Sequence, residues 1–338
     1  MRLYAIPEPV NKWAVNYWAK SRHLPSIVTR FSYNARERKH TMQSEQYIQA
    51  TAVSRFFSSS LIRDLAKRGK SPLLARLVAE SGLDSTLNPE DTIEMVFEHA
   101  FHYLKQKSFR HEYAYKAALT HKVLLGIHSL RTASMLTEFR VGDCKADVVI
   151  LNGTGSVYEI KSERDTLSRL EKQISAYRTV FAKVNVIVGD NHVDEVLKRL
   201  PCDVGIMTLG KRYRISTLRE AIDNPSRTNS SAIFSSITSK EAELIMKSLG
   251  IEIPSVPNTQ RFSAYKEVFE TIPPDVAHKE MVKTLKRTRK LTDLEPYIDN
   301  LPAALQAVAL SSKLNIKQLT NLIETLKTPV ETARKWAL

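Results

Sequence analysis

The sequence predicts an α/β fold in which a small mixed β-sheet is flanked by helices, with helical regions before and after it. Two observations carry this prediction. Short β-branched runs are confined to the middle of the chain, whereas apolar residues at spacings of three and four dominate both ends. The predicted strands lie at 148–151, 157–160, 184–188 and 204–208.

The middle of the chain is expected to contain a hairpin followed by helices. Turn-forming residues at 152–156 separate the first two strands, which favours a hairpin with a loop of four or five residues. Apolar residues at helical spacing then predict a helix over 166–181, and Asp165 or Thr166 is suited to cap it. A short helix is predicted at about 192–200. This order of elements is typical of a small sheet with helices packed on it.

Helices are predicted on both sides of this region. They cover 45–68, 91–106 and 111–125 before it, and 239–249, 262–271, 275–289, 301–311 and 315–326 after it. Residues 224–232 are rich in Asn, Ser and Pro and suggest a boundary. We expect a basic, aromatic-rich helical domain over 1–98, a sheet domain over 99–220 and a helical C-terminal domain over 221–338.

The chain is strongly basic. It has 50 Lys and Arg against 36 Asp and Glu, a net charge of +14. Residues 1–76 hold fourteen of the basic residues and four of the acidic ones, together with the aromatic residues Tyr4, Trp13, Tyr17, Trp18, Phe31, Tyr33 and Tyr47. Cations and flat rings suit a nucleic-acid surface, but a basic helical domain with an aromatic core has the same composition. A second basic stretch at 279–290 either contacts phosphate or forms a solvated helix face.

Several classes of protein find no support in the sequence. It contains no apolar run of about 18 residues, which a membrane span needs, and it does not start with a signal-peptide pattern. It has no Gly-rich phosphate-binding loop. Cys144 and Cys202 are too few for a disulfide scaffold, so we expect reduced thiols, a cytoplasmic location and no membrane partner.

Three charged residues stand out on the two hairpin strands. Alternation places Glu159 and Lys161 on one face of the second strand with Val157. On the first strand, the same alternation puts Asp147 on the face of Val149 and Leu151. Charges on a core strand are costly unless they are compensated, and a divalent cation held by the two carboxylates would do this. Alternatively, one face is wet and Glu159 and Lys161 form an exposed ion pair.

Further polar residues lie around this hairpin. Gln173 and Tyr177 are four residues apart on the helix that follows, and Glu112 begins the predicted helix upstream. With Ala146-Asp147 and Glu159-Ile160-Lys161, this pattern resembles the PD-(D/E)XK nuclease superfamily. The Gln173–Tyr177 pair and Glu112 resemble the subgroup typified by the RecB nuclease domain, and residues 158–177 resemble an uncharacterised bacterial family within the superfamily.

The resemblance covers about 100–210 and implies a restriction-endonuclease-like core that cuts phosphodiester bonds. It implies Mg²⁺ or Mn²⁺ held by Asp147, Glu159 and the Ile160 carbonyl, with Glu112 completing the site. Lys161 would be the catalytic lysine that orients or deprotonates the attacking water. Gln173 would act in the site, while Tyr177 would hold nucleic acid or belong to the core. Just beyond the motif, Arg164 and Arg169 either contact phosphate or are surface residues.

The sequence therefore predicts a metal-dependent nuclease with DNA as the expected substrate. Two alternatives stay open. One is a nucleic-acid-binding protein that keeps the fold without cleavage. The other is a subunit of a larger assembly for phage defence, transposition or repair, in which a protein partner docks on the C-terminal helices and recruits the nuclease domain.

Overall fold

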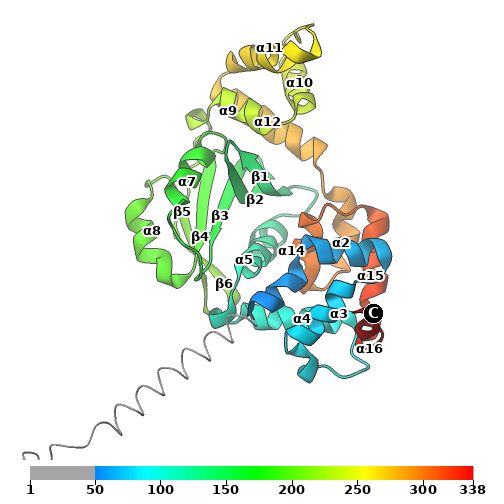
Figure 1. Cartoon of the computed structure of the whole chain (residues 1–338). Helices are drawn as coiled ribbons and strands as arrows, with labels where there is room; N and C mark the ends of the chain where they lie inside the picture. Colours follow the sequence, from blue (N-terminus) through cyan, green and yellow to red (C-terminus); the bar gives the residue numbers. More distant parts are fainter. Residues whose placement is uncertain (1–49, 338) are drawn as a thin grey trace, which may run out of the picture. The chain divides into compact units, whose positions relative to one another are not determined.

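A six-stranded sheet forms the middle of the molecule, as a computed structural model that describes residues 50–337 shows (Figure 1). The strands lie in the order β1 to β6, and their bounds are β1 (Ser134–Val141), β2 (Cys144–Asn152), β3 (Thr154–Lys161), β4 (Lys183–Val188), β5 (Gly205–Gly210) and β6 (Arg214–Arg219). The β1–β2, β2–β3 and β5–β6 pairs are antiparallel, whereas β3–β4 and β4–β5 are parallel. The predicted mixed sheet in an α/β fold is therefore confirmed.

The two parallel connections run through helices. The helix α7 (Leu170–Arg178) joins β3 to β4, and α8 (Val193–Arg199) joins β4 to β5. Parallel neighbours need such crossover connections, because the chain must return to the starting edge before it can pair again. One consequence matters for function: α7 comes directly after β3, so its first turns lie beside the end of that strand.

Helices on both sides of the sheet bury two separate apolar cores. One core joins Val148, Ile150 and Ile160 of the sheet to helices from both ends of the described chain. These helices are α2 (Ser59–Arg68), α3 (Pro72–Glu80), α4 (Ile93–Lys105), α5 (Glu112–Leu119), α13 (Glu295–Asp299), α14 (Ala303–Ser311), α15 (Ile316–Leu326) and α16 (Val330–Arg334). Because residues far apart in sequence share this core, the N-terminal and C-terminal helices stabilise each other.

The second core covers the opposite face, where Val149, Val157 and Val186 meet α7 and α8. Four further helices pack here as well: α9 (Ser230–Ser236), α10 (Ser239–Ser248), α11 (Asn258–Glu270) and α12 (Pro274–Thr288). Figure 1 shows α7 and α5 on opposite sides of the sheet. The predicted C-terminal helices are thus confirmed with bounds that differ by a few residues.

Several local predictions were wrong. The predicted helix over 45–68 is interrupted at Ser58, which caps α2 by accepting a hydrogen bond from the Leu61 N–H at 3.4 Å. The hairpin loop is shorter than expected, because Asn152 already pairs with Thr154 and Gly153 alone makes the turn at φ +71°. That left-handed conformation favours glycine. Strands β1 and β6 were not predicted.

The start of α7 also differs from the prediction. The helix begins at Leu170 and is preceded by Arg169, so neither Asp165 nor Thr166 caps it. Asp165 Oδ2 instead accepts hydrogen bonds from the Ser162 N–H at 2.7 Å and from the Ser162 hydroxyl at 2.6 Å. A short polar side chain that bonds the backbone three residues away stabilises a turn in place of a helix start. Residues 162–169 therefore form a turn between β3 and α7.

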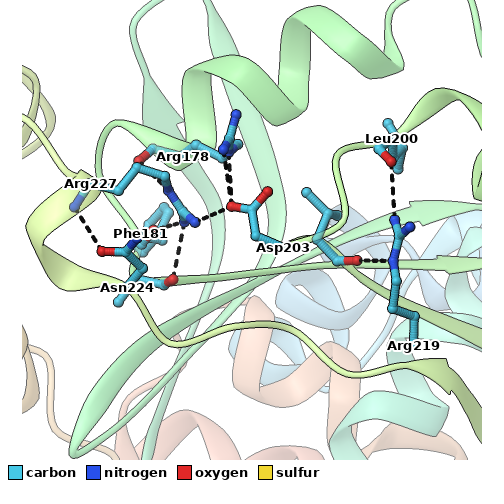
Figure 2. A network of polar contacts seen from close by, with 9 residues as sticks. Arg178, Phe181, Leu200, Asp203, Arg219, Asn224 and Arg227 are labelled. Atoms are coloured by element: carbon cyan, nitrogen blue, oxygen red, sulfur yellow. Dashed lines mark hydrogen bonds and ion pairs between the residues drawn. The ribbon is translucent and has the colours of Figure 1, made fainter.

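An arginine–aspartate network fastens the Asn/Ser/Pro-rich segment at 224–232 to the end of α7 and to the loops that precede β4 and β5 (Figure 2). Asp203 Oδ2 accepts hydrogen bonds from Arg178 at 3.0 and 3.2 Å and from Arg227 Nη1. The Arg227 Nη2 group donates to the Phe181 and Ala182 carbonyl oxygens at 3.0 and 3.1 Å. We call Arg178, Asp203 and Arg227 the Asp203 network.

The described residues, 50–337, all belong to one compact unit. The division into domains at 98 and 220 stays a prediction. The aromatic residues up to Tyr47, and most of the basic segment with them, lie outside the described residues. In the part of the chain that is described, no helix has the length and apolarity that crossing a membrane requires.

Candidate active site

A polar cavity of about 500 Å³ lies where the ends of β2 and β3 meet α5 and α7. Every residue that was predicted to be catalytic lines it: Glu112, Asp147, Glu159, Lys161 and Gln173. Ile160 and Arg169 line it too. Chain segments 60 residues apart in sequence thus contribute to one site, as the sequence pattern predicted.

Glu159 and Lys161 line this cavity and form a buried ion pair. Lys161 Nζ donates to Glu159 Oε1 at 2.8 Å. The side chain of Glu159 is only 2% exposed and that of Lys161 only 10%. The alternative of an exposed pair on a wet face is therefore wrong. Burial raises the pKa of Glu159, and Lys161 opposes this shift as its nearest cation.

Two side chains of α7 complete this ion pair. Gln173 Nε2 donates to Glu159 Oε1 at 2.5 Å, and Gln173 Oε1 accepts from Lys161 Nζ at 3.0 Å. The Tyr177 hydroxyl lies 2.8 Å from Glu159 Oε2 and 2.7 Å from the Lys145 carbonyl oxygen. Tyr177 is fully buried in the second core and does not line the cavity, so its ring packs in the core while its hydroxyl positions Glu159.

Asp147 lies where β2 and β3 separate. The two strands pair regularly up to Val148 and Tyr158, but the next row, Asp147 opposite Glu159, is not paired. At this row, a side chain replaces the backbone as hydrogen-bond acceptor: Asp147 Oδ2 accepts a hydrogen bond from the Ile160 N–H at 2.7 Å. Burial, with Glu159 and Glu112 nearby, raises the pKa of Asp147 to about 8.

Strict alternation does not hold at this row. In β2, Ala146 packs in the second core but Val148 packs in the first, so the strand switches faces at Asp147. In β1, Met135 packs in the first core but Phe139 in the second. The premise that put Asp147 on the face of Val149 and Leu151 was therefore wrong, because both strands switch faces at the same place.

The switch in β1 occurs at Glu138, which sequence reasoning missed. Glu138 has φ +53°, a left-handed conformation that is costly for a non-glycine residue. Oxygen atoms of Glu112, Glu138 and Asp147 all lie within 4.8 Å of one another. A third strand therefore supplies a carboxylate to the site.

A sequence signal for Glu138 did exist. Gly142 and Asp143 connect β1 and β2 as a two-residue hairpin loop, with Val141 paired to Cys144 and Gly142 at φ +55°. Gly-Asp at the centre of a tight turn is a common hairpin signal. Counting back from that turn places Glu138 opposite Asp147, so the partner could have been found by register alone.

Cations at the rim balance the acidic cluster only in part. Lys116 Nζ lies 3.1 Å from Glu112 Oε1, and Lys145 Nζ lies 3.7 Å from Glu138 Oε2. Both carboxylates are about half exposed. Arg164 does not line the cavity and donates to the Ser108 carbonyl oxygen at 3.1 Å. The described residues thus place the acidic cluster of Glu112, Glu138 and Asp147 in a cavity that five basic side chains also line, and Lys161 is the buried one among them.

The fold and the site define an α/β protein with an acidic cavity at the divergence of two sheet strands. The family model described as bacteriophage P4 protein cII matches residues 105–334, which is more than half of the chain. The chain belongs to this family. The matched range includes the whole sheet, every residue of the cavity and the C-terminal helices.

Individual relatives are distant or partial. Protein cII of Enterobacteria phage P4 is 35% identical over 80 residues, which are 23% of this chain and 30% of that protein. The chain therefore matches less than a third of the length of this curated relative. Among solved structures, the SPO1766 protein of unknown function from Silicibacter pomeroyi is 18% identical and has a TM-score of 0.28. That match covers 41% of this chain and 93% of the other.

Proposed function

We propose that the protein is a metal-dependent nuclease that hydrolyses phosphodiester bonds, with DNA as its substrate. The observation that carries the proposal is the cavity itself. It brings the Glu112, Glu138 and Asp147 carboxylates within 4.8 Å of one another, next to the buried Glu159–Lys161 pair. The resemblance of Asp147, Glu159 and Lys161 to the PD-(D/E)XK motif supports the same reaction.

The donor set suits Mg²⁺ or Mn²⁺. Hard divalent cations prefer carboxylate and carbonyl oxygens, and three carboxylates already gather here. Burial first, and then the nearby Glu159 and Glu112 carboxylates, raise the pKa of Asp147, and a bound cation would oppose this shift by stabilising the ionised carboxylate. Asp147, Glu138 and Glu112 would hold the ion, and Glu159 and the Ile160 carbonyl would join them if the Glu159–Lys161 pair opens. Such an ion would supply charge neutralisation for the attacked phosphate.

Lys161 is suited to act on the attacking water. An ammonium group has three hydrogen-bond donors, and Glu159 and Gln173 occupy two of them. The third is available to a water molecule or a phosphate oxygen in the cavity. Because Gln173 and Glu159 hold Lys161 Nζ in place, it needs little reorganisation as charge develops in the transition state. Arg169, at the same cavity, would contact phosphate.

One observation favours the alternative of a nucleic-acid-binding protein without cleavage. Both oxygens of Glu159 already have donors among the described residues, so the centre of the site is satisfied without a metal. The recruitment of the protein by a partner on its C-terminal helices also stays a proposal. We propose a cytoplasmic location, which the two free thiols of Cys144 and Cys202 support.

The test is incubation of the purified protein with single-stranded, duplex and covalently closed circular DNA, with Mg²⁺, Mn²⁺, Ca²⁺ or EDTA. We expect cutting with Mg²⁺ or Mn²⁺ that Asp147→Asn abolishes while DNA binding in Ca²⁺ persists. Lys198→Ala is the matched control, because Lys198 is exposed on α8 and does not line the cavity. Calorimetry with Mn²⁺ separates the alternatives: metal binding without cutting supports a dependent subunit, and no metal binding rejects the nuclease.

A further inference from the structure

A second, larger cavity of about 1040 Å³ runs along β1. Six successive residues of this strand, 135–140, form one wall. Residues 290–291 and 293–294 after α12, together with 310–311 and 313–317 from the end of α14 to the start of α15, form much of the other. β1 is the edge strand of the sheet, so no further strand covers this side among the described residues. We call this cavity the β1 groove.

The β1 groove adjoins the active-site cavity. Glu138 and Arg140 line both. Because Glu138 lies opposite Asp147 and Arg140 lies two residues further along β1, a chain-like ligand in the groove would reach the acidic site beside these two residues. A ligand bound here and a bond cut there can therefore belong to one molecule.

The charge of the groove complements a polyanion. Five basic side chains line it, against two acidic ones. Arg289 and Lys290 are paired with Glu241 and Asp293. The other three, Arg140, Lys313 and Lys317, are exposed and have no carboxylate within ion-pair distance among the described residues. Exposed cations without partners are the groups that bind phosphates.

The walls between these cations are apolar. Leu291 and Leu294 are half-buried, and Ile316 is 43% exposed, a high value for a large apolar side chain. In a duplex, the bases are stacked on one another and expose only their edges in the grooves, so their flat faces cannot cover an apolar wall. In a single strand, unstacked bases are free to cover apolar surface while the phosphates reach cations. Cations and apolar walls together therefore favour a single strand.

We propose that the β1 groove binds single-stranded nucleic acid and guides it into the active-site cavity. Only the guidance of the strand into the active-site cavity rests on the proposed nuclease function, since binding of a strand in the groove needs no cutting. Lys313 and Lys317 contact phosphates, and Ile316 between them contacts a base. Arg140 holds the phosphate next to the acidic site.

The test compares two variants with equal charge loss. The groove variant is Lys313→Gly/Lys317→Gln. Lys313 has φ +54°, which glycine adopts readily, so this change is not expected to unfold the protein. The control is Lys198→Gln/Lys211→Gln, on α8 and after β5, away from the groove. Fluorescence anisotropy with a labelled 20-nucleotide single strand, the matching duplex and an RNA strand is measured in EDTA over a salt series.

We expect the groove variant to bind the single strand about tenfold more weakly at 0.1 M salt, while the control stays within about twofold of the wild type. The slope of log affinity against log salt should flatten by about 1.4, since two phosphate contacts are lost at about 0.7 each. The wild type should bind the single strand more tightly than the duplex. An equal loss in both variants, a preference for duplex, or competition by polyglutamate as strong as by DNA would overturn the proposal.

The outcomes also separate the two proposals. If the groove variant loses binding but the wild type cuts nothing with any metal, the groove stands and the nuclease fails. If the groove variant binds like the wild type while Asp147→Asn abolishes cutting, the nuclease stands and the groove fails.

Discussion

The Asp203 network and the active-site cavity use carboxylates in opposite ways. Around Asp203, one carboxylate is shared by the guanidinium groups of Arg178 and Arg227 (Figure 2). Around Asp147, several carboxylates gather and the pKa of Asp147 is raised to about 8. The first arrangement stabilises the fold, because both guanidinium groups donate hydrogen bonds to the same carboxylate. The second destabilises the fold unless a cation or a proton is bound, which is typical of a functional site.

The largest expected effect concerns Lys161. If the protein is a nuclease, Lys161→Ala should lower the single-turnover cleavage rate by on the order of 10²–10⁴, as for a positioned proton-transfer group. Lys161→Arg should rescue little, because a planar guanidinium neither accepts a proton nor fits the place of a compact ammonium. The measurement is single-turnover cleavage at saturating protein, with a binding isotherm in Ca²⁺. A wild-type rate with weakened binding would reduce Lys161 to a phosphate contact.

Breaking the Asp203 network should cost stability and leave the chemistry intact. Asp203→Ala removes the shared acceptor and leaves two partly buried guanidinium groups without a carboxylate. We expect a loss of about 2 kcal/mol in the free energy of unfolding, less than for a fully buried pair. Urea denaturation measures this change. The turnover of folded protein should match the wild type, and a specific loss of cutting would show that the two regions are coupled.

Asp147→Asn should stabilise the metal-free protein, whereas Asp203→Ala should destabilise it. Between the ordinary aspartate pKa of 3.8 and the folded value of about 8, the unfolded chain releases a proton that the folded protein retains. The stability of the wild type therefore falls as the pH rises through this window, whereas Asn does not titrate and can still accept the Ile160 N–H.

The difference in melting temperature between Asp147→Asn and the wild type, measured in EDTA, should be small at pH 4 and positive at pH 8. At pH 8, the expected gain in the free energy of unfolding is on the order of a few kcal/mol. Asp143→Asn is the control, since that side chain is 91% exposed. A difference that does not grow with pH would mean that Asp147 is ionised and well compensated in the folded protein.

The smallest expected effect on stability concerns Glu138. Glu138→Gly removes a carboxylate from the site and relieves the left-handed backbone. The free energy of unfolding should therefore stay equal or rise by up to about 1 kcal/mol, and the melting temperature should follow it. Mn²⁺ affinity, measured by calorimetry, should fall about tenfold if Glu138 is a ligand, in line with the loss of one stabilising contact. Glu138→Asp keeps the charge and should retain more affinity. If both variants bind Mn²⁺ with the affinity of the wild type, Glu138 is not part of the metal site.

Much of the candidate site could be predicted because local spacing determines it. Glu159 and Lys161 are two residues apart on a strand, so they share a face wherever the strand alternates regularly. Gln173 and Tyr177 are four apart on a helix, so they share a helix face. The short connection from β3 to α7 then brings both pairs together. Period and connection length were enough for these four residues.

Register alone could place Glu138 opposite Asp147, but only the tertiary structure decided that both side chains reach the cavity. Alternation predicts a face for Asp147, but the face switch in both strands overrides it, and that switch depends on a left-handed residue that periodicity cannot reveal. Whether Glu159 and Lys161 are buried also lay beyond the sequence, because burial depends on α7 and its polar side chains closing over them. The β1 groove likewise joins β1 to residues about 170 positions later, and no local pattern carries contacts at that separation.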